Sequence, residues 1–123
     1  MWTDDELSRI GEADELSIAL LRQDGSLRKP VIIWVVRVGN ELYARSAYGR
    51  GAAWFRGVQL KHKGRIDAGG IQKDVSFEDA DPTANDAIDT AYRSKYRRHG
   101  AQYVDSVTNT EARSTTIRIV PND

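Results

Sequence analysis

Two glycines and an arginine stand three to five residues ahead of a tryptophan, in the segment 46–51 (SAYGRG) that leads into 52–55 (AAWF). We expect a helix to begin near Ala52 and to reach Lys63. Free backbone amides at a helix N-terminus bind anions well, and glycines allow a ligand to approach the backbone closely. With Arg50 adding a charge, this segment predicts a site for a phosphate or another anion.

Three further cations precede this loop in a predicted hairpin and could face it: Arg22, Arg28 and Lys29. The alternative is that Gly49 and Gly51 only serve a turn and that the cations are solvated, because short glycine loops are weak signals. The sequence leaves both interpretations open.

Aromatic side chains near the loop could stack on a planar ligand ring. Trp34 lies in the middle of an apolar strand, which is more typical of core or interface packing. Trp54 and Phe55 adjoin the glycine loop, and Trp54 is the better candidate for ligand contact.

The segment 92–99 (YRSKYRRH) mixes cations and aromatic residues, as nucleic-acid-binding segments do. A structural interpretation also explains it, because acidic residues gather where the helix begins and basic residues where it ends. Asp89 can also pair with Arg93 at a spacing of four. We favour this interpretation and expect no nucleic-acid partner.

No arrangement of residues predicts catalysis by the protein alone. His62 and His99 are the only histidines, and neither has ligands at metal-binding spacing, so no metal site is predicted. The acidic residues of 78–81 precede Pro82 and are explained by helix capping. Nucleophile elbow, P-loop and dinucleotide fingerprint are absent, so we predict no catalytic residue. If the protein is an enzyme, a bound cofactor supplies the chemistry.

The composition is that of a globular chain without extreme charge. The 123 residues predict one domain, 1–123, and 18 basic residues balance 18 acidic ones. There is no cysteine, which excludes disulfides and thiolate sites. The longest apolar run, Val31 to Val36, is far shorter than the roughly 20 residues of a membrane helix. We expect a cytoplasmic protein without membrane contact.

Turn residues divide much of the chain into hairpins, since Asp-Gly, Gly-Asn and Gly-Gly pairs all favour tight turns. These turns are 24–25, 39–40 and 69–70, and the predicted strands around them are 16–20, 31–38, 42–46, 65–68 and 71–77.

The predicted strand 31–38 is apolar on both faces. In a closed antiparallel barrel one face fills the interior, so the other must be covered by a helix or a second subunit. This pattern predicts a homodimer.

Helix signals complete the picture. Thr3 and Glu6 form a capping-box pattern before a short helix, and Asp81-Pro82 precedes a helix predicted to end near Gly100. The alternation of residues 113–120 predicts a last strand. Six strands with helices give an α+β class, and closure as a small barrel removes exposed edges.

The chain resembles a small bacterial family of uncharacterised domains that is similar to the FMN-binding split-barrel and deazaflavin-dependent nitroreductase superfamily. The residues that carry the resemblance are Arg22, Gly25, Arg28, Pro30, Gly49, Gly51, Trp54 and Phe55. It implies a six-stranded antiparallel split β-barrel with a cofactor groove lined by Arg28, Lys29, Ser46, Tyr48, Gly49, Arg50, Gly51 and Trp54. The relatives usually have proline and asparagine where this chain has Ala53 and Gly57.

Two functions follow as hypotheses. One is a homodimeric, oxidoreductase-like protein that binds FMN or a deazaflavin between subunits and reduces a small electrophile. The other is a split barrel without any cofactor that serves as a binding or structural domain.

Overall fold

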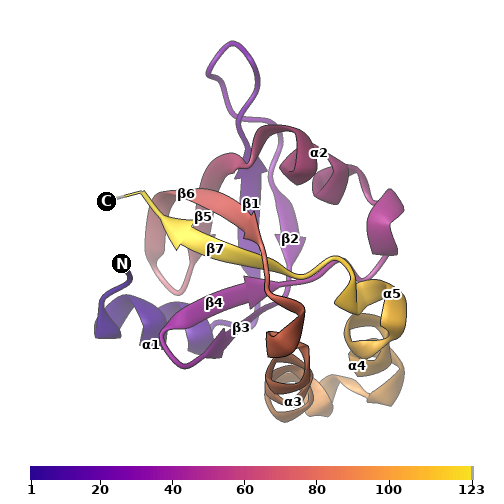
Figure 1. Cartoon of the computed structure of the whole chain (residues 1–123). Coiled ribbons are helices and arrows are strands. Elements are labelled where there is room, and N and C mark those ends of the chain that lie inside the picture. The colour runs from indigo at the N-terminus through magenta and orange to yellow at the C-terminus, as the bar shows by residue number, and fades with distance from the viewer. Residues whose placement is uncertain (123) are drawn as a thin grey trace.

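The computed structural model describes residues 1–122, which form one seven-stranded antiparallel sheet with helices around it (Figure 1). The strand order is β2-β1-β5-β6-β7-β4-β3. The strands are β1 (Leu16–Leu20), β2 (Val31–Ile33), β3 (Val35–Val38), β4 (Glu41–Ala44), β5 (Lys63–Ala68), β6 (Ile71–Asp79) and β7 (Ile117–Pro121). The α-helices are α1 (Asp4–Glu12), α2 (Ala53–Lys61), α3 (Asn85–Tyr96), α4 (Ala101–Thr108) and α5 (Thr110–Arg113), with short 3-10 turns η1 (Gly49–Gly51), η2 (Pro82–Ala84) and η3 (Arg97–His99).

The predicted antiparallel split barrel is confirmed, but one predicted strand is two. The run 31–38 breaks at Trp34 into β2, which pairs with β1, and β3, which pairs with β4. These halves therefore occupy the two ends of the strand order. Because one short connection joins both edges, the sheet curls until it nearly closes.

The three predicted turns are confirmed. β3 and β4 pair up to Val38 and Glu41, which leaves Gly39 and Asn40 as a two-residue loop. β5 and β6 enclose Gly69 and Gly70, both at positive φ (58° and 84°). Gly25, at φ 88°, lies at the tip of the long β1–β2 hairpin. Positive φ at these positions is what glycine permits at little steric cost.

Replacement of Gly69 by alanine should lower the free energy of unfolding by about 2 to 4 kcal/mol. A Cβ there would lie 2.2 Å from the backbone oxygen of Arg9, so α1 or the turn must shift. Gly25→Ala is the matched control, because its φ is also positive but nothing lies within 4 Å of the added atom. It should cost only about 1 kcal/mol. Equal losses in urea denaturation would contradict the role of the Arg9 contact.

The main core lies inside the barrel and extends to α1. The predicted capping box is confirmed, since Thr3 accepts from the Glu6 amide and Glu6 accepts from the Thr3 amide. Leu7 and Ile10 are buried in the same cluster as the apolar residues of the strands. Trp2 closes this end with a 3.0 Å hydrogen bond from Nε1 to the Ile119 carbonyl oxygen.

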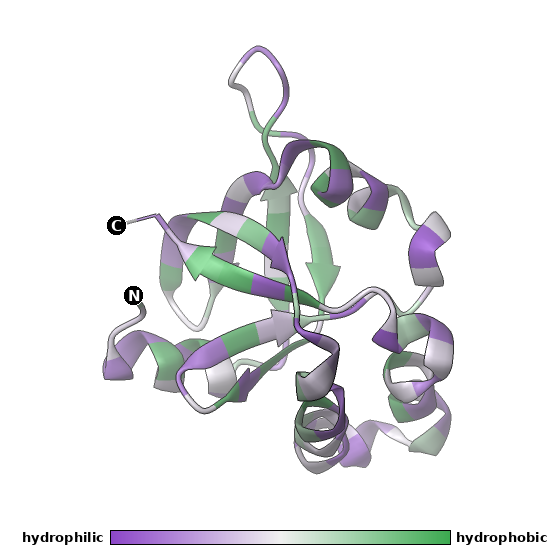
Figure 2. Cartoon of the chain, in the orientation of Figure 1, coloured by the Kyte–Doolittle hydropathy of each residue, from purple (hydrophilic) through white to green (hydrophobic). Residues whose placement is uncertain are grey.

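A second core lies between β3 and the C-terminal helices, which gather on one side of the sheet (Figure 2). Val36 packs there with Ile88, Tyr92 and Tyr96 of α3, and Val104 and Val107 of α4. The apolar second face of the predicted strand is thus covered by a helix at β3. At β2 this face stays open, because Ile32, which shares the face of Val36, is 56% exposed.

The C-terminal quarter differs from the prediction. The helix expected to end near Gly100 ends at Tyr96 and continues as η3. The segment 101–113 forms α4 and α5, for which the sequence pattern predicted no helix. The last strand begins at Ile117, because Arg113 ends α5 and buried Thr115 and Thr116 form the connection.

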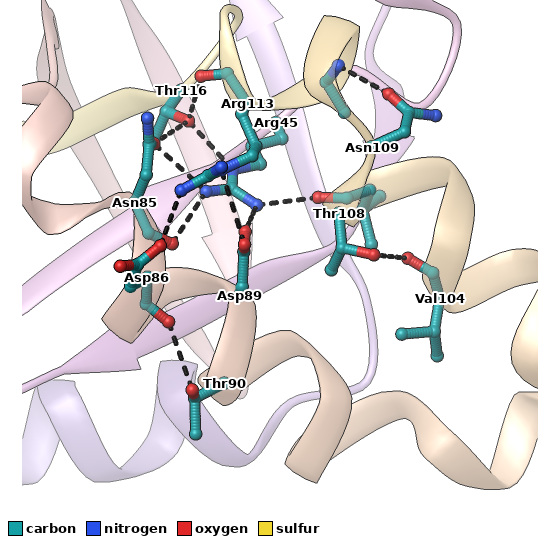
Figure 3. A network of polar contacts seen from close by, with 12 residues as sticks. Arg45, Asn85, Asp86, Asp89, Thr90, Val104, Thr108, Asn109, Arg113 and Thr116 are labelled. Atoms are coloured by element: carbon teal, nitrogen blue, oxygen red, sulfur yellow. Dashed lines mark hydrogen bonds and ion pairs between the residues drawn. The ribbon is translucent and has the colours of Figure 1, made fainter.

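A buried arginine joins these helices to the sheet (Figure 3). Arg45, at the end of β4, is 2% exposed and pairs with Asp89 of α3. Its guanidinium also donates to the Val107 carbonyl of α4 at 2.8 Å, to Thr116 Oγ1 at 2.8 Å and to Asn85 Oδ1 at 3.1 Å. One side chain therefore ties β4 to α3, α4 and the start of β7.

The pair predicted between Asp89 and Arg93 is wrong. Asp89 is 6% exposed, and its second oxygen lies 3.3 Å from Nε of Arg113 while the first binds Arg45. Arg93 is exposed. Burial decides the partner of Asp89, because a carboxylate inside the protein needs charged or hydrogen-bonding partners that the fold brings to it.

Lys95 and two tyrosines make stability depend on pH in opposite directions. Burial lowers the pKa of Lys95 to about 8 from its usual 10.5 and raises the pKa of Tyr92 and Tyr96 above 10. Between pH 8 and 10 the unfolded chain holds the extra proton on Lys95, so stability rises with pH. Above pH 10 the unfolded chain loses phenol protons first, so stability falls.

The rise should be about 1 kcal/mol, since Lys95 is partly exposed to solvent. Lys95→Met should abolish the rise and keep the fall, as measured by urea denaturation from pH 7 to 11. The Val35 carbonyl keeps its bond from the Tyr96 hydroxyl in this variant. A rise that persists in Lys95→Met would contradict the assignment.

Candidate functional site

Two adjoining hollows, which we call the groove, run between β2, α2, α4 and the loop after β4. Their volumes are about 410 Å³ and about 210 Å³, and they share Val31 and Trp54. The larger hollow is lined by Val31, Ile32, Ile33, Trp34, Arg45, Ala47, Tyr48, Trp54, Tyr103, Ser106 and Val107. The smaller is lined by Ile18, Leu20, Arg22, Arg28, Lys29, Val31, Ala53 and Trp54.

The larger hollow is mainly apolar and aromatic. Trp54, in the first turn of α2, is 8% exposed and packs edge-on against Phe55 with 6.1 Å between ring centroids. Ile32 of β2, Tyr48 of the loop and Tyr103 of α4 are exposed around the opening. Flat apolar surfaces of this kind suit a ring system, which would cover side chains that water now contacts.

The smaller hollow is cationic. Arg22, Arg28 and Lys29 reach it from the hairpin between β1 and β2. A third hollow of about 650 Å³ shares Arg22 and Arg28 with it and continues along α2 to Lys61. Apolar surface at one end and cations at the other suit a ligand with a ring and an anionic group.

Gly57 of α2 leaves room for one of these cations. A Cβ at this position would lie 3.1 Å from Nη1 of Arg28 and 2.4 Å from Cδ1 of Leu20. The relatives usually have asparagine where this chain has Gly57. Here the Arg28 guanidinium lies in the space beside the helix that a side chain at position 57 would occupy.

The structure brings four of the eight predicted site residues to the groove: Arg28, Lys29, Tyr48 and Trp54. Ser46 does not line the groove, because it is fully buried, and its hydroxyl is without a hydrogen-bond partner. Gly49, Arg50 and Gly51 form η1 and do not line the groove.

The glycine loop packs against α5. A Cβ on Gly49 would lie 2.2 Å from a carboxylate oxygen of Glu111, and its φ of 74° favours glycine. Its amide donates to the Ser46 carbonyl, while Arg50 donates to the Ser114 carbonyl at 2.8 Å. A carboxylate thus already lies beside the loop, which supports the turn interpretation of Gly49.

Trp34 combines both interpretations given to it. Its ring stacks on Tyr96 with centroids 4.0 Å apart and planes 5° apart, and it also lines the larger hollow. Tyr92 and Tyr96 are themselves buried, so these tyrosines of segment 92–99 are not exposed for stacking on bases. Arg98 and His99 contact Asp14.

The sequence did not predict that α4 lines one side of the groove. Tyr103 and Ser106 line the groove beside Val107, and Val104 and Val107 at a spacing of three after Gly100 were the available helix signal. Arg45 also reaches the groove, but its guanidinium is fully occupied by the buried network.

Residues 1–122 hold neither a metal-binding cluster nor a helix that could span a membrane. Within this part of the chain no three histidine, cysteine or acidic residues are placed to hold a metal ion. In the same residues, every helix is too short or too polar to cross a bilayer.

A bacterial family described as an uncharacterized protein conserved in bacteria (DUF2255) matches residues 6–119, nearly the whole chain. The chain belongs to the DUF2255 family. No curated protein matches the sequence.

Solved structures similar to this DUF2255 chain share its fold at low sequence identity. A Listeria innocua protein with the provisional name pyridoxamine 5′-phosphate oxidase is 13% identical, with a TM-score of 0.66 over 98% of this chain and 93% of the other. An FAD-binding protein from Mesorhizobium loti is 14% identical, with a TM-score of 0.60 over 99% and 91%. An F420 reductase is 13% identical, with a TM-score of 0.58 over 94% and 92%. These matches show that the fold is an FMN-binding-like split barrel, and at such identities they show the fold alone.

Proposed function

We propose that this protein binds a flavin or deazaflavin in the groove and acts as a reductase of a small electrophile. The observation that carries the proposal is that an apolar, aromatic hollow adjoins a cationic one. The FAD-binding and F420 reductase neighbours support it, because the same fold holds such cofactors there. When bound, the cofactor would supply hydride transfer.

The residues of the chain bind and orient. Trp54 and Val31 lie where the two hollows meet and would contact the ring system. Arg28 and Lys29 would pair with the anionic group, and their charge would hold the cofactor in one direction. Ile32 and Tyr103 would shield one face of the ring from water.

A second copy of the chain is the proposed cover of the groove. Val31 and Ile32 of β2 and Tyr103 of α4 form exposed apolar surface at its opening. Association would bury them, as expected for a split barrel with its cofactor between subunits. Sedimentation should give a dimer at micromolar concentration, and Ile32→Lys should shift it toward monomer; a monomeric wild type would contradict this assembly.

A thermal-shift titration with FMN, FAD and a deazaflavin tests the cofactor. Ligand at one hundred times its dissociation constant should add about 2.7 kcal/mol, or about 10 °C in melting temperature. Hemin is titrated in parallel, because two solved structures of similar fold are a heme storage protein and an FAD and heme binding protein. A rise with hemin alone would contradict the flavin proposal. Visible absorbance of the purified protein is the independent measurement.

The second candidate is a split barrel without cofactor. It is favoured by the Glu111 carboxylate beside Gly49 and by the engagement of Arg50 with Ser114. It predicts colourless protein and flat titrations with all three cofactors. That result would overturn the reductase proposal.

A further inference from the structure

The third hollow, of about 650 Å³, continues the groove along α2. It shares Leu20, Arg22 and Arg28 with the cationic hollow, and that hollow shares Val31 and Trp54 with the aromatic one. Its walls are α2 and the hairpin between β1 and β2, which stands out from the barrel beside this helix (Figure 1). The three hollows therefore follow one another, with the cationic hollow in the middle.

The cations of the third hollow are free to bind a ligand. Within residues 1–122, the side-chain nitrogens of Arg22, Arg28 and Lys61 make no hydrogen bond or ion pair with the chain, and all three residues are exposed. Asp24 is the one acidic residue in the lining, and its carboxylate accepts from the amide of Ser26 at 2.9 Å and from its hydroxyl at 2.6 Å. Three cations against one carboxylate suit an anionic group.

Gly57 keeps the cationic hollow open to the third one. A Cβ at this position would lie 3.1 Å from Nη1 of Arg28 and 2.4 Å from Cδ1 of Leu20. Both of these neighbours line both hollows. A side chain at position 57 would therefore fill space where the two hollows meet.

Apolar side chains accompany the cations. Leu60, in the last turn of α2, is 85% exposed, and Leu21 is half-buried in the same lining. The third hollow is also larger than either hollow of the groove. Room, positive charge and exposed apolar surface together suit a phosphate that carries a base.

We propose that the third hollow binds a second phosphate of the cofactor together with its nucleoside, so that this protein takes a dinucleotide flavin in preference to a mononucleotide. The inference rests on the proposed function for the ring end of the ligand. Arg28 would contact both phosphates, Lys61 would pair with the second, and the base would lie against Leu60. Gly57 determines the specificity, because the absence of a side chain leaves the passage open.

Calorimetric titration of the full chain with FMN, FAD and AMP tests the proposal. FAD should bind at least about tenfold more tightly than FMN, because the second phosphate adds charged hydrogen bonds. AMP, the part of FAD that FMN lacks, probes the third hollow alone and should also bind. FAD that binds no more tightly than FMN would overturn the proposal, as would a deazaflavin with an acidic tail that binds more tightly than FAD.

The three ligands separate this proposal from the proposed function. Equal affinity for FMN and FAD, without binding of AMP, would contradict the dinucleotide preference and leave the flavin site in place. Binding of AMP without either flavin would contradict the reductase and support the phosphate and nucleoside site. No binding of any ligand would overturn both proposals.

Variants locate the second phosphate. Lys61→Ala should weaken FAD binding about tenfold and change FMN binding by less than about twofold. Arg56→Ala is the matched control, because Arg56 is exposed on the same helix and lines none of the three hollows. Equal losses for FMN and FAD in Lys61→Ala would overturn the proposal.

Gly57→Asn tests the passage. The added side chain should weaken the binding of FAD more than that of FMN, and circular dichroism shows whether the variant folds. Lys61→Ala changes an exposed side chain, so it keeps the proposal testable if Gly57→Asn does not fold. A folded Gly57→Asn that prefers FAD as strongly as the wild type would contradict the role of Gly57.

Discussion

Replacement of Arg45 by alanine is expected to lower the free energy of unfolding by about 3 to 5 kcal/mol. The change leaves the buried carboxylate of Asp89 with only the 3.3 Å contact to Arg113 and removes the bonds to Val107, Thr116 and Asn85. The substitution weakens the contacts that hold the C-terminal helices against the sheet. Urea denaturation followed by circular dichroism gives the value.

Two controls test whether the unpaired charge causes this loss. The double variant Arg45→Met with Asp89→Leu should recover part of the stability, because it removes both charges together. Arg65→Ala removes an exposed ion pair with Asp74 and should cost no more than about 1 kcal/mol. If Arg45→Ala cost as little as Arg65→Ala, the network would not be what joins α3 and α4 to the barrel.

Replacement of Arg28 by alanine is expected to weaken binding of the proposed phosphate-bearing cofactor by about 1.5 to 3 kcal/mol, or roughly 10- to 150-fold in dissociation constant. Arg28 lines both the small cationic hollow of the groove and the third hollow, which continues along α2 to Lys61. Its guanidinium is therefore placed to bind an anionic group. The fold should be unaffected, because the residue is exposed. Titration followed by flavin fluorescence measures the change.

Arg50→Ala is the informative comparison. The sequence placed Arg50 in the same site, whereas the structure directs it to Ser114 and over the Phe55 ring at 5.4 Å. We therefore expect near-normal cofactor binding. Arg93→Ala on α3 is the control, because Arg93 is exposed and does not line the groove. Strong loss of binding in Arg50→Ala, with none in Arg28→Ala, would return the anion site to the glycine loop.

Much of the fold was predictable because its signals are local. The turns at Gly39 and Gly69 need positive φ, and the capping box of Thr3 and Glu6 is complete within four residues. Alternation along 16–20 predicted β1, and alternation along 113–120 predicted a last strand, which the structure places at Ile117–Pro121. The break at Trp34 gave no such signal, because the run 31–38 is apolar throughout and only the curvature of the sheet sends its halves to different partners.

The candidate site also combines features that the sequence predicted with features that only long-range contacts decide. The residue types of the groove, including Arg28, Lys29, Tyr48 and Trp54, were evident from spacing and resemblance. The sequence did not show which cations face the groove and which serve packing. Arg50 and Arg45 bind partners that are 64 and 71 residues away in sequence. The sequence by itself determined the turns, the caps and the helix after Ala52, since each depends on neighbours along the chain. That helix was expected to reach Lys63 but ends at Lys61, because β5 begins at Lys63. The barrel class followed from the number of strands and from the resemblance. Only the tertiary structure decided the strand break, the wall made by α4 and the partner of each buried charge, because burial and long-range contacts create those preferences and no local pattern encodes them.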